Sequence, residues 1–270
     1  MRLITIITTT AALAITMLGL SSCNNSSGGS TYSYSSVAYN IATRQGADSS
    51  TISKSAVNYA FNSGDNTLDI ATTATPYTGS KTAGGTVSFS TTVDMTYDQT
   101  KGYFTFSTSN VKATGATVSG LSGSFDYITG TLYLEYTVNG THTVKSTSSL
   151  AYPYTETQMI DTAHTTSAWT QNQAVYLFDV NTSTNKANIS IYYIQTEKDG
   201  QNHVLQYSGA QVTPTRTGYV ITADTLKAIS DYKVYYLRNA KFTIDNNWHS
   251  LNGTFQLDKQ QATVKGGLFN

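Results

Sequence analysis

The residues that most often perform catalysis are few in this chain and lie far apart along it. The histidines are His142, His164, His203 and His249, and no two of them have the spacing of metal ligands. The glutamates are Glu135, Glu156 and Glu197, and most aspartates fall in predicted turns, so no acid pair typical of a glycosidase can be assigned. The Gly-x-Ser-x-Gly motif of hydrolases does not occur. We therefore predict a non-catalytic protein with no metal site and no cofactor.

One segment has oxygen-bearing side chains at alternate positions, as a calcium loop does. It runs from Asp179 to Asn185. The sixth position is Thr184 where a calcium loop has glycine, and Ser190 stands where the bidentate glutamate belongs. The sequence therefore favours a hairpin turn over a cation site.

Tyrosine, with 20 residues, is the most abundant aromatic side chain that could form a binding surface. Successive strand residues point to opposite faces, so one ring in each of the pairs 192–193 and 235–236 is expected to face outward. Exposed rings can stack on sugars or contact another protein. The ligand-binding candidates are Tyr192, Tyr193, Tyr235, Tyr236 and Trp248. Most of the other tyrosines are expected to form cross-strand pairs that stabilise sheets.

The composition excludes one class of partner and points to a location. Only 12% of residues are charged, and 16 basic residues balance 16 acidic ones. Without a basic patch, the chain is not expected to bind nucleic acid. Abundant Ser, Thr and Tyr are typical of a β-rich protein outside the cytoplasm.

The single cysteine lies where a lipid anchor would be attached. Met1-Arg2 precedes an apolar stretch that ends at Leu20-Ser21-Ser22-Cys23. This ending resembles the bacterial lipobox, which implies cleavage between Ser22 and Cys23 and acylation of Cys23. We predict a lipoprotein signal peptide over residues 1–22, excluded from the fold, and a membrane anchor whose several acyl chains hold stably. No cysteine then remains for a disulfide or a thiolate metal site.

A polar tether, from Asn24 to Ser30, follows the anchor. Lipobox, tether and Tyr/Thr-rich β-domains together resemble the lipoproteins of Bacteroidota-type bacteria. The resemblance implies attachment to the outer membrane, with an envelope protein or a glycan as partner. Surface-exported members often have an acidic run after the cysteine, and this chain has none, so the periplasmic and surface faces both stay open.

The elements that must position these residues are strands. Residues 131–138 alternate large apolar and smaller or polar residues, the pattern of a half-buried strand. Asn139-Gly140 predicts a type I′ hairpin turn. Helix is expected to be scarce, with one or two turns at most over Ala223–Ser230. Short strands at regular spacing predict an all-β fold of sandwiches or small barrels.

The mature chain is predicted to contain two related units in tandem. Val57–Phe61 corresponds to Val175–Phe178, and Gly130–Leu134 corresponds to Gly253–Leu257. The expected organisation is a tether and lead-in over 23–54, a first β-unit over 55–147, a connector over 148–172 and a second β-unit over 173–270.

Three hypotheses for function follow from these patterns. The first is a lipid-anchored binding or structural module of the cell envelope. The second is a lipocalin-like cavity or a cleft that holds a small hydrophobic ligand or a glycan. The third is a pilin-like surface subunit, because lipoprotein pilins of Bacteroidota are processed at an arginine near the start of the mature chain, and Arg44 occupies such a place.

Overall fold

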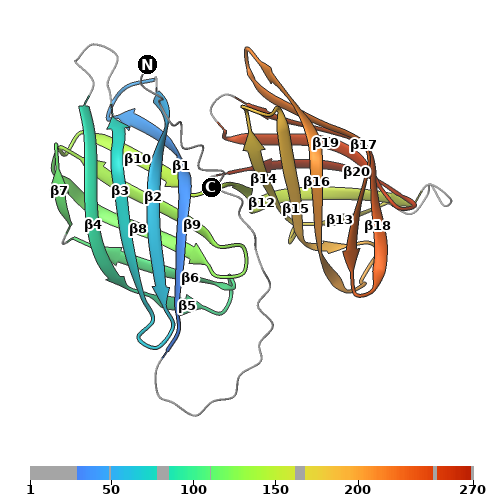
Figure 1. Ribbon diagram of the computed structural model, residues 1–270, viewed down its shortest axis with the longest axis horizontal. Helices are drawn as coiled ribbons and strands as arrows, with labels where there is room; N and C mark the ends of the chain where they lie inside the picture. The colour runs from blue at the N-terminus through green and yellow to red at the C-terminus, as the bar shows by residue number, and fades with distance from the viewer. Residues whose placement is uncertain are drawn as a thin grey trace, which may run out of the picture. The chain divides into compact units, whose positions relative to one another are not determined.

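The described residues of this computed structural model, 29–48, 50–77, 85–109, 111–161, 168–245 and 248–268, are folded without helices. They form twenty strands in two antiparallel sheets of ten, which confirms the all-β prediction (Figure 1). The chain divides into unit 1, residues 1–125 with 133–146, and unit 2, residues 126–132 with 147–270. Within the described part of the chain, no helix has the length and apolarity needed to cross a membrane. The predicted signal peptide, Ser22 and Cys23 lie outside the described residues.

Unit 1 is a meander whose last strand lies beside its first. Its strands are β1 (Thr31–Arg44), β2 (Ser50–Asn62), β3 (Thr67–Tyr77), β4 (Gly85–Asp94), β5 (Thr96–Asp98), β6 (Tyr103–Thr108), β7 (Lys112–Thr114), β8 (Val118–Asp126), β9 (Thr131–Val138) and β10 (His142–Thr147). The order in the sheet is β5-β6-β8-β9-β10-β1-β2-β3-β4-β7. Because β6 pairs with β8 while β7 pairs with β4, the run from β6 to β7 joins the two ends of the sheet. The sheet therefore curls back on itself as a small barrel.

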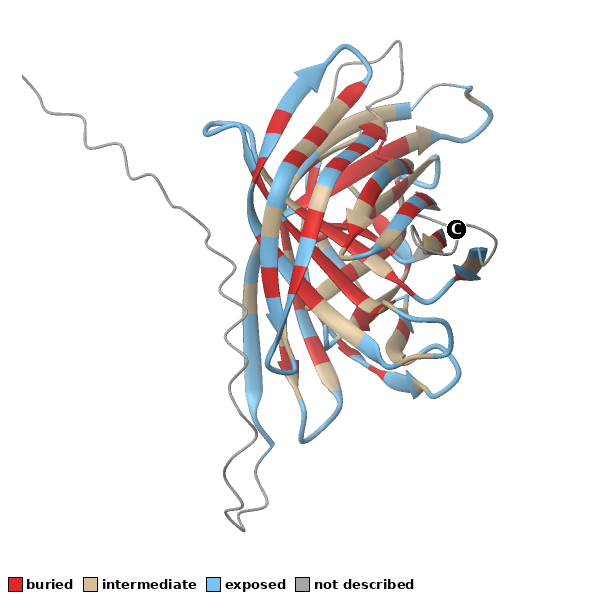
Figure 2. Ribbon diagram, turned by 90° about the vertical axis from the view of Figure 1, so that its right-hand side faces the viewer, coloured by how far each residue is buried: buried red, intermediate tan, exposed pale blue. Residues whose placement is uncertain are grey.

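The predicted alternation decides which side chains fill this barrel. Leu132, Leu134, Tyr136 and Val138 of β9 are buried, and the residues between them are partly exposed. Figure 2 shows the same alternation of buried and exposed positions along neighbouring strands. At the end of β9, Asn139 and Gly140 have φ angles of 51° and 66°, so the predicted type I′ turn is confirmed.

A chain of buried polar groups links the first strand of unit 1 to its neighbours. Ser146 Oγ of β10 donates to Asn40 Oδ1 of β1 at 2.7 Å, and Asn40 Nδ2 donates to Ser55 Oγ of β2 at 2.9 Å. Ser55 Oγ lies 3.1 Å from Thr75 Oγ1 of β3. Because each buried group has a partner, the chain fixes the register of four adjacent strands without leaving a costly unpaired polar atom.

Unit 2 repeats this arrangement with a different closing strand. Its strands are β11 (Leu150–Tyr152), β12 (Tyr154–Asp161), β13 (Ala168–Gln171), β14 (Val175–Asn181), β15 (Lys186–Gln195), β16 (Asn202–Thr215), β17 (Gly218–Ser230), β18 (Lys233–Asp245), β19 (Ser250–Leu257) and β20 (Gln260–Gly267). Their order is β11-β14-β15-β16-β17-β18-β19-β20-β12-β13. Because β11 pairs with β14 and β12 pairs with β20, the run across Pro153 joins the two ends of this sheet.

The two units have similar topology, as the sequence predicted. In each, a strand near the start of the unit pairs with the last strand, β1 with β10 and β12 with β20. The matched segments lie in corresponding strands. Val57–Phe61 lies in β2 and Val175–Phe178 in β14. Gly130–Leu134 runs into the start of β9, and Gly253–Leu257 forms the end of β19.

The structure differs from the expected organisation in three segments. The lead-in expected over 23–54 contains all of β1 and the start of β2, and the connector expected over 148–172 contains β11, β12 and β13. Both segments are rich in Ser and Thr. Because hydroxyl side chains occupy many of their strand positions, the alternation of apolar and polar residues that indicates a strand is absent from the sequence. Ala223–Ser230, expected to hold a turn or two of helix, is the second half of β17. Its pairing with β18 overrides the local preference of its Ala and Leu residues.

Aromatic rings fill both interiors. In unit 1, Phe125 lies 5.7 Å from Tyr34 and 5.5 Å from Phe61, measured between ring centroids. In unit 2, Phe242 lies 5.2 Å from Phe178 and 5.5 Å from Phe255. Such contacts contribute beyond the area they bury.

Candidate functional site

Three of the five aromatic candidates have buried rings. Tyr192 packs on Ala151 and Leu177, and burial raises the pKa of its phenol. Tyr235 and Trp248 are also buried. These rings offer no face to a ligand arriving from solvent.

The two remaining candidates lie at the surface in different ways. Tyr193 is partly buried and has a φ of 58° at a β-bulge between Ile191 and Ile194. Tyr236 is exposed on β18, next to the buried Tyr235, as alternation along a strand requires. Only Tyr236 therefore belongs to an exposed apolar surface at the end of its hairpin.

That surface, named here the β17–β18 tip, gathers four exposed large apolar side chains of unit 2. Its members are Ile229, Tyr232, Val234 and Tyr236, with exposed fractions of 72%, 104%, 40% and 37%. Ile229 lies directly opposite Val234, and Tyr236 lies opposite Lys227. Side chains opposite one another on one face of a hairpin touch, so these residues form one continuous patch.

Cations accompany the apolar members of the tip. The guanidinium carbon of Arg238 lies 4.5 Å from the ring centre of Tyr236, and Lys233 Nζ lies 4.8 Å from the ring centre of Tyr235. Lys227 is exposed on the opposite strand. Arginine and lysine at this distance from an aromatic ring are attracted by its face. The tip thus combines exposed apolar side chains with the cations of Lys227, Lys233 and Arg238 and with the exposed carboxylate of Asp231 in its turn.

The turn of the tip is strained. Asp231 and Tyr232 connect β17 to β18 with φ angles of 51° and 61°. A type I′ turn needs positive φ at both positions, which Asn-Gly supplies at least cost and tyrosine does not. Residues held in such conformations are concentrated at functional sites. Tyr232 therefore occupies a costly position in which its ring projects fully into solvent.

A polar cluster behind the turn fixes its position. His203 Nδ1 of β16 lies 3.2 Å from Asp231 Oδ2, and the Tyr235 hydroxyl lies 3.4 Å from His203 Nε2. Burial raises the pKa of Tyr235, and the carboxylate of Asp231 raises it further. The neutral phenol therefore persists beside the imidazole, and the cluster braces the tip against β16.

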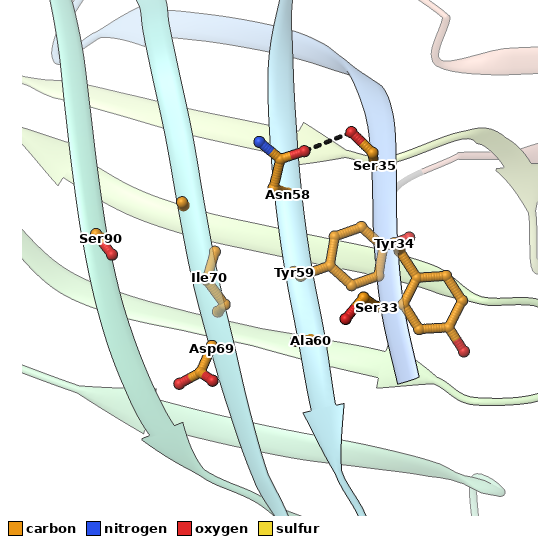
Figure 3. Close-up of a pocket in the computed structure, with 10 residues that line it drawn as sticks. Ser33, Tyr34, Ser35, Asn58, Tyr59, Ala60, Asp69, Ile70 and Ser90 are labelled. Carbon is orange, nitrogen blue, oxygen red and sulfur yellow. Dashed lines mark hydrogen bonds between the residues drawn. The ribbon is translucent and has the colours of Figure 1, made fainter. Parts of the chain in front are cut away.

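A second surface feature is a shallow groove of about 410 Å³ on the outer face of unit 1 (Figure 3). Small side chains line it, among them Ser33, Ala60, Ala71 and Ser90. The rings of Tyr34 and Tyr59, at the alternate positions of β1 and β2, stack on each other at 4.8 Å and pack against the buried Phe125. Its polar groups bind one another.

In Figure 3, Ser35 donates to Asn58 across the groove. Asp69 accepts hydrogen bonds from Thr92 Oγ1 at 2.6 Å and from Asn62 Nδ2 at 3.3 Å. A groove of small, mutually satisfied groups holds no strong determinant for a ligand.

The residues considered for catalysis or metal binding lie apart. The described residues contain no group of three or more His, Cys, Asp or Glu side chains arranged to hold a metal ion. His142 packs edge-on against Tyr77 in unit 1, whereas the backbone nitrogen of His249 donates to Asp245 in unit 2. His164 lies outside the described residues.

The loop over residues 179–185 is a turn. Asn181 Oδ1 accepts from the backbone nitrogens of Ser183 and Thr184, so the oxygen that would serve a cation caps the hairpin between β14 and β15.

Comparison with known proteins finds a distant similarity to a solved structure and no matching family. No protein-family model matches the chain, and no curated protein matches it. Among solved structures, the chain is similar to the isotype 1 transferrin binding protein B (TbpB) from serogroup B Neisseria meningitidis, at 8% sequence identity. The match covers 89% of this chain and 76% of that chain, with a TM-score of 0.26. This score is too low for the match to support an argument about function.

Sequence reasoning found Tyr236 and missed the rest of the tip. The alternation of Lys227, Ile229, Val234 and Tyr236 about a two-residue turn was a usable signal. Asp231-Tyr232 conceals it, because this dipeptide is not a typical type I′ turn sequence.

Proposed function

We propose that this chain is a non-catalytic binding module of the bacterial cell envelope, anchored to the membrane by a lipid on Cys23. The partner of the module contacts the β17–β18 tip. The observation that carries the proposal is Tyr232, fully exposed on a strained turn between Ile229 and Val234. Exposed apolar patches with a charged rim are typical of contact surfaces. A stable β-hairpin has no structural need for a tyrosine at this turn position.

The partner contact can be tested in living cells by photocrosslinking. A photoreactive phenylalanine analogue replaces Tyr232 in the full chain, and the matched control carries it at Tyr97, an exposed tyrosine of unit 1. We expect a discrete crosslinked envelope component from position 232 and none from position 97. Equal crosslinking at the two positions would contradict the proposal.

The anchor is tested separately. Cys23→Ala is expected to abolish incorporation of labelled fatty acid and to release the mature chain from the membrane fraction. Retention of label in this variant would exclude Cys23 as the lipid attachment site.

Strand exchange in a pilin-like polymer is the second candidate function, and β1 favours it. The strand lies between β10 and β2, and its last residue, Arg44, is exposed just before the turn at Gly46. Cleavage after Arg44 would separate the whole of β1 from the chain and expose the edges of β2 and β10 to a strand of another copy. A ladder of heat-resistant oligomers on gels of native envelopes, absent from the Arg44→Gln variant, would support strand exchange. Absence of this ladder for the unsubstituted protein would refute strand exchange.

The aromatic interior weighs against a lipocalin-like cavity in unit 2. Tyr176, Phe178, Phe242 and Phe255 contact one another across the barrel, at centroid distances from 5.2 to 6.2 Å. These rings occupy space that an enclosed hydrophobic ligand would need.

A further inference from the structure

We infer that the partner of the β17–β18 tip is a folded protein, which takes the Tyr232 ring into a surface pocket and pairs with charged side chains of three neighbouring hairpin ends. This inference rests on the proposed function, because it names the partner of the same site and the extent of the contact. It is carried by one end of unit 2, where exposed apolar side chains lie between turns that carry charges of both signs.

Three hairpins of unit 2 end side by side at the tip. Because β15 to β20 form an antiparallel meander, the turns of the β15–β16, β17–β18 and β19–β20 hairpins lie at the same end of the sheet. The tip belongs to the middle hairpin, since β17 and β18 lie between β16 and β19 in the sheet. The apolar side chains of the tip are therefore flanked by a turn on each side.

Contacts between the hairpins hold the three turns in place. At the start of β16, His203 Nδ1 lies 3.2 Å from Asp231 Oδ2 in the middle turn. On the other side, Asp258 Oδ1 accepts from the Tyr236 nitrogen at 2.9 Å, and the Asp258 nitrogen donates to the Tyr236 carbonyl oxygen at 3.0 Å. A surface held in this way loses little conformational freedom when a partner binds.

Each of the three turns carries both a carboxylate and an ammonium group. The pairs are Asp199 with Lys198, Asp231 with Lys233, and Asp258 with Lys259. This concentration occurs in a chain of which only 12% of residues are charged. At the opposite end of the same meander, the turns over 182–185 and 216–217 contain no carboxylate. Charges of both signs are therefore gathered around the tip.

An apolar centre with a charged rim is the construction of a protein contact surface. Tyr232 and Ile229 have exposed fractions of 104% and 72% in the middle hairpin, and the charged turns lie on either side. In protein interfaces a few anchors, tyrosine among the commonest, contribute most of the binding energy, and a polar rim excludes water around them. Tyr232 has the position of such an anchor.

The mixed signs of the rim select the class of partner. Because each turn carries both signs, the surface does not present the single positive sign that binds a nucleic acid or an anionic lipid layer. A neutral glycan offers no charge to either group, and desolvating an unpaired charge is costly. A folded protein presents both signs at fixed positions and complements every turn.

The extent of the contact is tested by photocrosslinking in cells from four positions of the full, anchored chain. The photoreactive phenylalanine analogue replaces Lys198, Tyr232 or Lys259, one in each turn, and the matched control carries it at Thr182, at the opposite end of unit 2. We expect the three turn positions to form adducts with one and the same protein, identified by its peptides in mass spectrometry of each adduct. Position 182 is expected to form none.

Variants of the anchor residue test its place at the centre of the contact. With the analogue at position 198, Tyr232→Ala is expected to lower the crosslinked fraction of the chain on the order of thirtyfold, the effect of losing an interface anchor. Tyr232→Phe keeps the ring and is expected to keep most of the crosslinked fraction. Tyr97→Ala in unit 1 is expected to leave it unchanged, and circular dichroism confirms that each variant is folded.

Removal of charge from one flanking turn tests the rim. With the analogue at position 232, Lys198→Gln with Asp199→Asn is expected to lower the crosslinked fraction about twofold to fivefold, the magnitude of exposed ion pairs. Asp65→Asn with Lys112→Gln removes the same two charges from unit 1 and is expected to leave the fraction unchanged.

Four results would overturn the inference of a folded protein partner across three turns. They are adducts from position 232 alone, a glycan or lipid as the crosslinked component, and an unchanged crosslinked fraction in either Tyr232→Ala or the variant that lacks the charges of Lys198 and Asp199. Each of them, with a specific adduct from position 232, would leave the proposed binding function in place. Equal crosslinking at positions 182 and 232, or no adduct from any position, would reject both.

Discussion

The same hairpin of the meander is broken in unit 1 and continuous in unit 2. In unit 1 the run after Gly102 splits into β6 and β7, of 6 and 3 residues, which pair with different neighbours. In unit 2 the corresponding β17 has 13 residues and pairs with β18 along its full length, from Gly218 to Ser230. Corresponding segments of the two related units therefore form different structures, a split strand in unit 1 and a continuous hairpin in unit 2.

The difference shows that closing the barrel and presenting a tip compete for one strand. A strand that bends across to a second neighbour, as β6–β7 does, cannot also run straight to an exposed end. Unit 2 closes through β11 and β12 on either side of Pro153 instead. Moving the break to another strand leaves β17 free to extend, and the candidate binding surface lies at its end.

The largest expected difference between the units is their response to alkaline pH. Burial raises the pKa of Tyr176 and Tyr207 in unit 2 and of Tyr136 in unit 1. A phenol whose folded-state pKa exceeds the unfolded value near 10 contributes stability that is complete below pH 10 and is lost as pH rises towards the folded value. The expected loss is about 1.4 kcal/mol per phenol for each pH unit above 10.

Unit 2 should therefore unfold at lower pH than unit 1. Hydrogen exchange followed by mass spectrometry between pH 9 and 12 reports the two units separately through their own peptides. Simultaneous opening of both units would show that they unfold as one body and would remove the contrast.

Truncation of the core ring in unit 2 is the next largest effect. Phe242→Ala removes a ring that contacts Tyr176, Phe178 and Phe255, and a loss of about 3–5 kcal/mol is expected. The matched change, Phe125→Ala, should cost unit 1 a similar amount. Urea unfolding with peptide-resolved exchange measures each loss. A loss shared equally by both units in either variant would argue against separate cores.

Replacing Asp231-Tyr232 by Asn-Gly is expected to stabilise unit 2 by about 1–2 kcal/mol. The reason is that asparagine and glycine adopt positive φ with little strain, whereas tyrosine does so at a cost. Thermal unfolding of the full chain measures the gain. A destabilised variant would mean that the link between Asp231 and His203 outweighs the turn strain.

The smallest effect concerns a bulge of unit 1. Ala74 has a φ of 50° between Thr72 and Thr75, and its nitrogen donates to Ser88 Oγ at 2.8 Å. Ala74→Gly relieves that strain at some cost in chain entropy, for a net gain of about 0.5–1 kcal/mol. Chemical denaturation measures it. The gain should be confined to unit 1 and should leave the tip unaffected.

The strand content and the repeat could be predicted because both depend on local patterns. Alternating residues such as those from Leu132 to Val138 specify a half-buried strand, and Asn139-Gly140 specifies its turn. The equal places of β2 and β14 follow from the same matched residues. These signals are contained within a few positions of the chain.

Other features depend on partners that are distant in the sequence. β1 has Ser and Thr at positions where a strand normally alternates with apolar residues, so its pattern does not indicate a strand. It is held in place by β10 through the hydrogen bond from Ser146 to Asn40, more than a hundred positions apart. Tyr192 is buried because Ala151 and Leu177 cover it, which no local pattern reveals. The tip was missed because Asp231-Tyr232 is not a typical turn sequence and because the strand geometry of Ala223–Ser230 depends on pairing with β18.

The pairing of first and last strands has a consequence for the timing of folding. β1 cannot complete its pairing until β10 has been made, and β12 cannot complete its pairing until β20 has been made. Contacts between such distant segments form slowly, because the entropy of closing a long loop is lost before the contacts stabilise the fold. Each barrel therefore closes only after its last strand has been synthesised. A nascent chain of this design stays open over most of the length of each unit.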